Sequence, residues 1–158
     1  MIRATSTAHA HSQAHSHSEA HAELAGIVTL DYDDRYRRRI ALTCENGFEF
    51  LLDLPKVIEL RDGDDLLLED GRHVRVRAAA EPLMKATASD PHHLIRTAWH
   101  VGNRHLPCEI HADHLILRYD HVIEGMLQQL GVDVERFDAP FNPEGGAYGQ
   151  GRTHSHDH

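Results

Sequence analysis

Histidine is concentrated at both ends of this 158-residue chain, and this placement restricts any hydrophobic core to the residues between them. The residues beside these histidines are mostly Ala, Ser, Gly and Asp, which cannot bury enough apolar surface to fold. A polar segment that concentrates imidazole is typical of divalent-metal binding, and the irregular spacing here favours a native role over an expression tag. The histidines of the two ends are His9, His11, His15, His17 and His21, then His154, His156 and His158.

The composition excludes several classes of function. A formal net charge of −9 argues against nucleic-acid binding, which needs a basic face. No apolar run approaches the roughly 20 residues of a membrane span, and no secretory signal is visible, so a cytoplasmic location is expected. Cys44 and Cys108 lie far apart, which excludes a Cys₄ zinc site and a framework of several disulfides. The chain has no HExxH, GxSxG or P-loop motif, so we expect no enzymatic activity.

The first half of the chain predicts a small all-β domain over residues 23–79, preceded by a disordered His-rich tail over residues 1–22. Asn-Gly at 46–47 and Asp-Gly at 70–71 are strong hairpin signals, and turn residues recur without any helical pattern. The basic cluster that begins at Arg35 adjoins acidic residues and predicts a solvated strand end. The expected strands are residues 26–30, 39–43, 48–52, 57–60, 66–68 and 73–77.

The second half predicts a ferredoxin-like βαββαβ domain over residues 80–138. Ser89-Asp90-Pro91 is a good helix start, and apolar residues then recur at three- and four-residue spacing as far as Val101. Asp120 is expected to cap a second helix that stops at Gly131. The expected strands are residues 83–88, 106–110, 115–119 and 132–137. The Pro- and Gly-rich and His-rich carboxyl tail, residues 139–158, is expected to wander over the surface.

Most histidines of the folded part are expected to be ordinary surface residues. His92 and His93 are adjacent on a helix and point about 100° apart, so they predict a solvated helix start and not a shared metal. His111 and His114 flank a turn and are expected to be exposed. His73 alternates with Val74 and Val76, and is therefore expected to face water. His100 is poorly spaced for joint chelation with His105 within one helix.

His105 is the strongest candidate metal ligand outside the tails. It follows the expected helix end, where it is exposed and held by structure on both sides. In a two-fold homodimer a residue at the axis meets its own copy, so two His105 side chains would supply two nitrogen ligands. His121 beside Asp120 is either a surface metal ligand or a solvated residue of a helix cap. Cys108 either contributes sulfur or is a buried thiol, and the buried thiol is favoured.

Three separate segments carry a resemblance to a known family. They are WHVGNRHLP at residues 99–107, RYDHVIEGML at 118–127 and APFNPEGGAYG at 139–149. With these motifs the chain resembles the UreE family of urease accessory proteins, which are nickel metallochaperones. The resemblance implies a partner- or peptide-binding β domain and a metal domain that dimerises, with nickel bound by His105 of each protomer. It also implies that His121 and the tail residues His154, His156 and His158 are metal ligands. Tyr119 stands where relatives can have histidine, and this departure from the family pattern argues against an accessory metal site at that position.

We therefore expect a homodimer that binds Ni²⁺ and donates it during urease assembly. The recipient that the resemblance implies is a complex of the urease accessory GTPase and apo-urease. Copper and zinc are expected to bind in vitro, because nitrogen ligands alone do not select nickel. Two other hypotheses remain. A passive divalent-metal buffer would need the tails but not a shared interface site, and a protein-interaction module would use the β domain with the histidines incidental.

Overall fold

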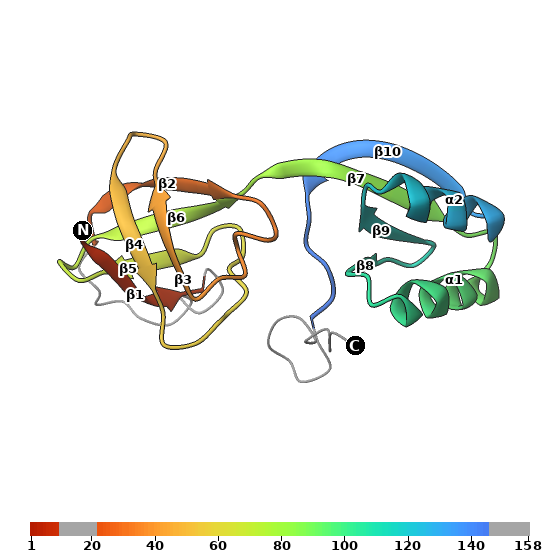
Figure 1. Cartoon of the computed structure of the whole chain (residues 1–158), viewed down its shortest axis with the longest axis horizontal. Helices are drawn as coiled ribbons and strands as arrows, with labels where there is room; N and C mark the ends of the chain where they lie inside the picture. The colour runs from red at the N-terminus through yellow and green to blue at the C-terminus, as the bar shows by residue number, and fades with distance from the viewer. Residues whose placement is uncertain (10–21, 146–158) are drawn as a thin grey trace. The chain divides into compact units, whose positions relative to one another are not determined.

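The computed structural model describes residues 1–9 and 22–145, and its two compact units divide between Ala79 and Ala80 (Figure 1). The strands of the first unit are β1 (Arg3–Ala8), β2 (Leu24–Leu30), β3 (Arg39–Thr43), β4 (Glu49–Asp53), β5 (Asp65–Leu68) and β6 (His73–Ala78). The second unit contains β7 (Ala80–Thr87), α1 (Pro91–Asn103), β8 (Glu109–Ile110), β9 (His114–Arg118), α2 (His121–Gln129) and β10 (Asp133–Pro140). These elements confirm a β domain followed by an α+β domain.

The first unit is a six-stranded sheet in the order β2-β6-β5-β1-β4-β3. Both predicted hairpins are present, and Gly47 and Gly71 provide the positive φ angles of 88° and 89° that their turns need. In β6, Val74 and Val76 are buried while Arg75 and Arg77, which alternate with them, are exposed, which is the expected period of two. The core is made mainly of leucine and valine with Phe50 and Cys44.

The prediction of a structureless tail over residues 1–22 was wrong at its beginning. Arg3–Ala8 form β1, which lies inside the sheet, parallel to β4 and antiparallel to β5. Ala4 is the one fully buried residue of this strand, so its sequence carries no apolar alternation that would reveal it. The strand is held by backbone hydrogen bonds to two neighbours and not by a hydrophobic face of its own. The His-rich tract at 10–21 therefore connects β1 to β2, and its predicted disorder lies outside the described residues.

Two further predictions for the first unit were wrong. Residues 57–60 form no strand, although Leu60 is fully buried and its N–H donates to the carbonyl oxygen of Arg35 at 2.8 Å. Arg35 is fully buried and not part of a solvated strand end. Its guanidinium donates to the Leu60 carbonyl oxygen at 3.4 Å and lies 5.7 Å from the ring centroid of Tyr32, so it fastens one long loop to another.

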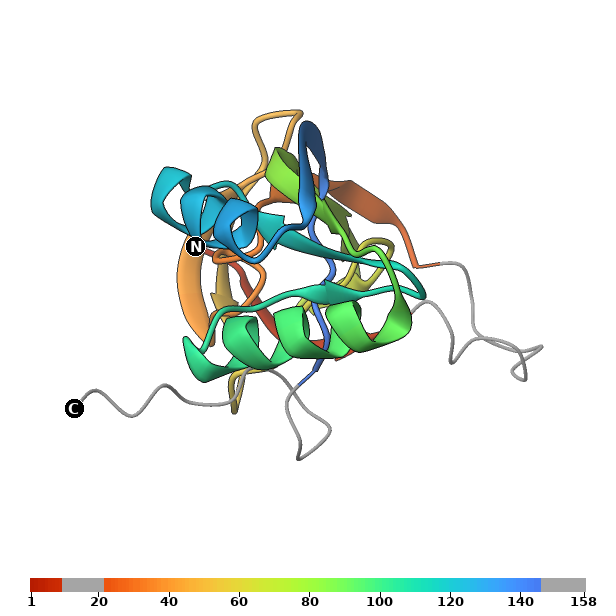
Figure 2. The same ribbon diagram turned by 90° about the vertical axis from the view of Figure 1, so that its right-hand side faces the viewer.

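The second unit has the predicted element order, with helices α1 and α2 on the same side of a four-stranded antiparallel sheet (Figure 2). The strand order is β10-β7-β9-β8. Met84 and Ala86 of β7 face Leu115 and Leu117 of β9 across the ladder, and these side chains pack with residues of both helices. Among residues 1–9 and 22–145, no helix has the length and apolar run needed to cross a membrane.

The prediction that residues 139–158 lie loosely over the surface was wrong for the start of this segment. β10 continues to Pro140, and Phe141 is fully buried with the Arg118 guanidinium 6.0 Å from its ring centroid. Asn142 then donates its N–H to Glu109 Oε2 at 3.0 Å, and the Glu144 N–H donates to the carbonyl oxygen of Cys108 at 2.8 Å. Residues 141–145 are thus attached to the segment around β8.

Candidate functional site

Helix α1 ends in a turn that places His105 in a strained backbone conformation. The His105 N–H donates to the Gly102 carbonyl oxygen at 3.0 Å, and the Leu106 N–H donates to that of Val101 at 3.3 Å. This pair of bonds defines a Schellman motif, whose left-handed position usually holds glycine. Here that position is His105, with φ 58°, the one non-glycine residue with positive φ in the described chain. The side chain is exposed.

Helix α2 ends in the same motif and provides an internal comparison. The Gly131 N–H donates to the Gln128 carbonyl oxygen at 3.0 Å, the Val132 N–H donates to that of Leu127 at 3.3 Å, and Gly131 has φ 80°. The chain thus uses glycine at one helix end and histidine at the other. A non-glycine residue in this region costs about 1 kcal/mol or more, and such strain is often found at functional sites.

His121 occupies the first position of α2 and is exposed. The neighbouring carboxylate is committed to capping, because Asp120 Oδ1 accepts from the Val122 N–H at 2.9 Å and from the Ile123 N–H at 3.1 Å. The predicted capping role of Asp120 is thus confirmed. Whether His121 binds a metal stays a prediction.

The motifs at residues 99–107 and 118–127 both line one hollow of about 290 Å³. Leu106 and Pro107 line it from the segment after α1, and Arg118, Tyr119 and Asp120 line it from the segment before α2. His105 and His121 are each adjacent in sequence to a lining residue. The fold therefore brings the neighbours of the two candidate ligands to the same part of the second unit.

Large apolar side chains are exposed on the helix that ends at His105. Ile95 and Trp99 are 68% and 64% exposed, and their four-residue spacing puts them on the same face of α1. Val122, beside His121 in α2, is 61% exposed. Surface apolar residues that gather in one region mark interaction sites more often than those scattered singly.

The tail histidines His154, His156 and His158 lie outside the described residues. The segment that leads to the tail is attached near His105. The Glu144 N–H donates to the carbonyl oxygen of Cys108, which follows His105 by three residues. Cys108 is half-buried. Burial raises the pKa of its thiol, as do the charges of Glu144 and Glu109, so the metal-binding thiolate is disfavoured there.

His111 and His114 form a stacked pair that does not converge on one ion. Their ring centroids are 4.4 Å apart and the planes differ by 11°. A metal lies in the plane of each imidazole that binds it, so two nearly parallel rings must first rotate. His111 is exposed as expected, whereas the His114 side chain is only 18% exposed. Within the described part of the chain, no group of three or more His, Cys, Asp or Glu residues is arranged to hold a metal ion.

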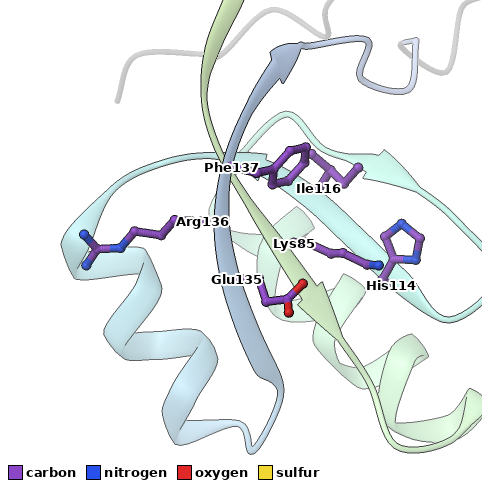
Figure 3. A pocket seen from close by; sticks show the side chains of 6 residues that line it. All are labelled: Lys85, His114, Ile116, Glu135, Arg136 and Phe137. Atoms are coloured by element: carbon purple, nitrogen blue, oxygen red, sulfur yellow. The ribbon is translucent and has the colours of Figure 1, made fainter.

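The sheet face opposite the helices carries a second, shallow hollow (Figure 3). Lys85, His114 and Glu135 contribute polar groups, and Ile116 and Phe137 contribute apolar surface. Arg136 extends away from them, and its guanidinium donates to both carboxylate oxygens of Glu124 in α2, at 2.9 and 2.8 Å. The mixed character of the lining does not define a ligand.

Two histidines that were expected to face water are instead structural. His73 is 13% exposed in its side chain, and its Nε2 lies 3.8 Å from Asp65 Oδ1. His93 is half-buried, and its Nε2 lies 2.7 Å from the carbonyl oxygen of Leu130. The position of His93, three residues after a capping Asp90, was the available signal, because the side chain at that position commonly turns back toward the helix start.

The fold and the site together define a class: a small two-domain protein whose candidate functional groups are exposed histidines at helix ends. A family model described as UreE urease accessory protein, N-terminal domain, matches residues 4–79, and the corresponding C-terminal domain model matches residues 81–158. The chain belongs to the UreE family of urease accessory proteins. This confirms the resemblance carried by the three sequence motifs.

Similar proteins span most of the chain. Urease accessory protein UreE of Bradyrhizobium sp. (strain ORS 278) is 53% identical over 156 residues, which are 99% of this chain and 70% of that protein. The protein of the same name from Rhodopseudomonas palustris (strain BisB18) is 54% identical over 158 residues, 100% of this chain and 72% of the relative. That of Rhodobacter capsulatus is 53% identical over 131 residues, 83% and 81% of the two chains. These relatives are named accessory proteins and not enzymes.

Proposed function

We propose that this protein is a homodimeric nickel metallochaperone that binds Ni²⁺ and donates it during assembly of the urease active site. The observation that carries the proposal is the exposed His105 at a helix-end position that favours glycine. A stable fold gains nothing from this strain, so the imidazole is retained for what it binds. Neutral imidazole suits nickel as a ligand.

The proposed dimer pairs the α1 faces of two protomers. Ile95 and Trp99 are exposed apolar side chains on the helix that ends at His105. A two-fold interface uses the same patch on both subunits, and the proposal places its axis beside the carboxyl ends of the two α1 helices. This arrangement supplies one imidazole from each protomer. It also explains why one protomer alone has no complete site among its described residues.

The carboxyl tail is proposed to supply the remaining ligands. The attachment of Glu144 to Cys108 fixes the start of the tail near the segment that follows His105. Eight residues lie between Gly145 and His154, and the nine Cα–Cα steps give a contour of roughly 30 Å when extended. His154, His156 and His158 are therefore within reach of the His105 pair. His121, beside the same hollow, is the proposed ligand of a further, weaker site.

The remaining elements of the proposal rest on the family. The recipient is a complex of the urease accessory GTPase and apo-urease, and the first unit binds partners. We assign the second unit to the ferredoxin-like class, which its βαββαβ order and the strand order β10-β7-β9-β8 support.

Calorimetric nickel titration of four proteins tests the metal site. These are wild type, a chain ending at residue 145, His105→Ala, and His111→Ala as a matched surface control. The truncated chain should keep one tight ion per dimer and lose the weaker ions of the tail. His105→Ala should lose the tight ion, whereas His111→Ala should resemble wild type. A tight ion that survives His105→Ala would refute the proposal.

The alternative function is a passive divalent-metal buffer, with Cu²⁺ and Zn²⁺ bound as readily as Ni²⁺. A buffer depends on the number of histidines in the tracts and not on one interface pair. Removal of residues 146–158 together with replacement of His9, His11, His15, His17 and His21 by serine should then abolish nearly all binding. Urease activation in nickel-limited cells separates the two functions further, because only the metallochaperone requires His105.

A further inference from the structure

The side chain of His93 makes hydrogen bonds in two directions at once. It lies in the first turn of α1, where Nδ1 is 3.1 Å from the backbone nitrogen of Ser89 and 3.0 Å from its hydroxyl oxygen. On the other side of the ring, Nε2 is 2.7 Å from the carbonyl oxygen of Leu130, the residue that caps the carboxyl end of α2. One imidazole thus joins the start of one helix to the end of the other.

These partners determine the tautomer of the ring. The Ser89 N–H is a donor, so Nδ1 must accept and carry no proton. The Leu130 carbonyl oxygen is an acceptor, so Nε2 must carry the proton and donate it. The neutral Nε2–H form satisfies both partners. The Asp90 carboxylate contacts the backbone of His93 and not Nε2, since its Oδ1 accepts from the His93 N–H at 2.8 Å.

We propose that His93 is a positioning residue that fixes α1 against α2 and thereby sets the placement of His105 and His121. The start of α1 is tied to the end of α2, while His105 follows the other end of α1 and His121 begins α2. Over the thirteen residues of α1, roughly 20 Å, a change of helix angle at the tied end becomes a displacement of His105. The second part of this proposal rests on the proposed nickel site.

The competing explanation is that His93 is an ordinary capping side chain of α1. At this helical position glutamate is a favoured residue, because its carboxylate also accepts from an N–H at the helix start. Glutamate cannot donate to the Leu130 carbonyl oxygen, whereas glutamine can. His93→Gln and His93→Glu are nearly equal in shape, so the pair separates capping from the link between helices. His92→Glu, at the exposed neighbouring position, is the control for added charge.

The first test measures the tautomer and the link in the full-length protein. Imidazole ¹⁵N spectra near neutral pH should show a protonated Nε2 and an unprotonated Nδ1 for His93. Amide exchange in the last turn of α2 should be roughly tenfold faster in His93→Glu than in His93→Gln, about the effect of one lost hydrogen bond. His92→Glu should exchange as wild type does. A protonated Nδ1, or equal exchange in the Gln and Glu variants, would overturn the proposal.

The second test links the bridge to the metal site. Nickel affinity at the tight site should fall severalfold in His93→Glu and be retained in His93→Gln. In a His105→Ala background the Glu substitution should have no further effect on nickel, while its effect on amide exchange persists. Unchanged nickel affinity in His93→Glu would overturn the positioning role. A wild type without a His105-dependent ion would instead refute the proposed function, and the exchange data alone would then decide the link between helices.

Discussion

At the scale of the residue, the strained left-handed backbone of His105 is what identifies it as a candidate ligand. Its sequence context, after Gly102-Asn103-Arg104, indicates the end of a helix. The context does not show that the left-handed position after the helix belongs to His105, since Gly102 itself is a reasonable helix stop. The structure continues α1 to Asn103 and assigns the left-handed conformation to His105.

The strain at His105 leads to a prediction about stability. His105→Gly should raise the free energy of unfolding by about 1 kcal/mol, because glycine has no Cβ to oppose the positive φ. The same variant should lose the tight nickel ion. Urea denaturation of the metal-free protein measures the first effect. Gly131→Ala, at the equivalent position of α2, is the mirrored control and should destabilise by a similar amount. A His105→Gly protein less stable than wild type would show that the ring itself stabilises the turn.

At the scale of the element, helix α1 illustrates how much a local signal determines. Ser89-Asp90-Pro91 predicted its start, and the structure confirms that Asp90 Oδ1 accepts from the His93 N–H and that Pro91 is the first helical residue. These interactions are local in sequence, so they are visible without a fold. β1 is the opposite case, because every partner that makes it a strand lies more than 40 residues away.

The Asp90 cap makes part of the stability depend on pH. The hydrogen bond from the His93 N–H is the main cause that lowers the pKa of Asp90 below its ordinary value. The folded state therefore favours the ionised form. This contribution is complete above pH of about 4, where the unfolded carboxylate is also ionised, and it is lost as pH falls through the lowered folded value.

Asp90→Asn tests this dependence, since asparagine also caps helices but does not titrate. The melting temperatures of wild type and Asp90→Asn should differ most at neutral pH and approach one another as the pH falls below about 4. Asp90→Ala should be less stable than both at neutral pH. A constant difference between wild type and Asp90→Asn over this range would contradict the assignment.

The attachment of the carboxyl segment is also a property of one element. Phe141 is fully buried, so Phe141→Ala should cost about 3 kcal/mol of unfolding free energy in the second unit. The release of residues 141–145 should also weaken the contribution of the tail to nickel binding without removing the His105 site. Calorimetry on Phe141→Ala and on Phe141→Leu, which keeps an apolar side chain there, separates the two effects.

At the scale of the whole molecule, the two units have separate cores, so each should tolerate loss of the other's structure. Deletion of residues 1–8 removes a strand from the interior of the first sheet. We expect this protein to lose the cooperative unfolding of the first unit while the second unit keeps its helical signal and its tight nickel ion. Substitution of His11, His15, His17 and His21 by serine is the matched control, and it should leave both unfolding transitions in place. Persistence of the first transition after the deletion would contradict the role of β1.

The sequence by itself determined the features whose causes are local. Caps, Asn-Gly and Asp-Gly turns and apolar periodicity give a β unit followed by an α+β unit, and the motifs around His105 and His121 give the family. Only the tertiary structure decided the features that depend on distant partners. These are the pairing of β1 inside the sheet, the burial of Arg35 and Phe141, and the link from His93 to Leu130. Each of these residues is buried or bonded because the fold brings a distant partner to it, and the residues next to it in sequence do not indicate that partner.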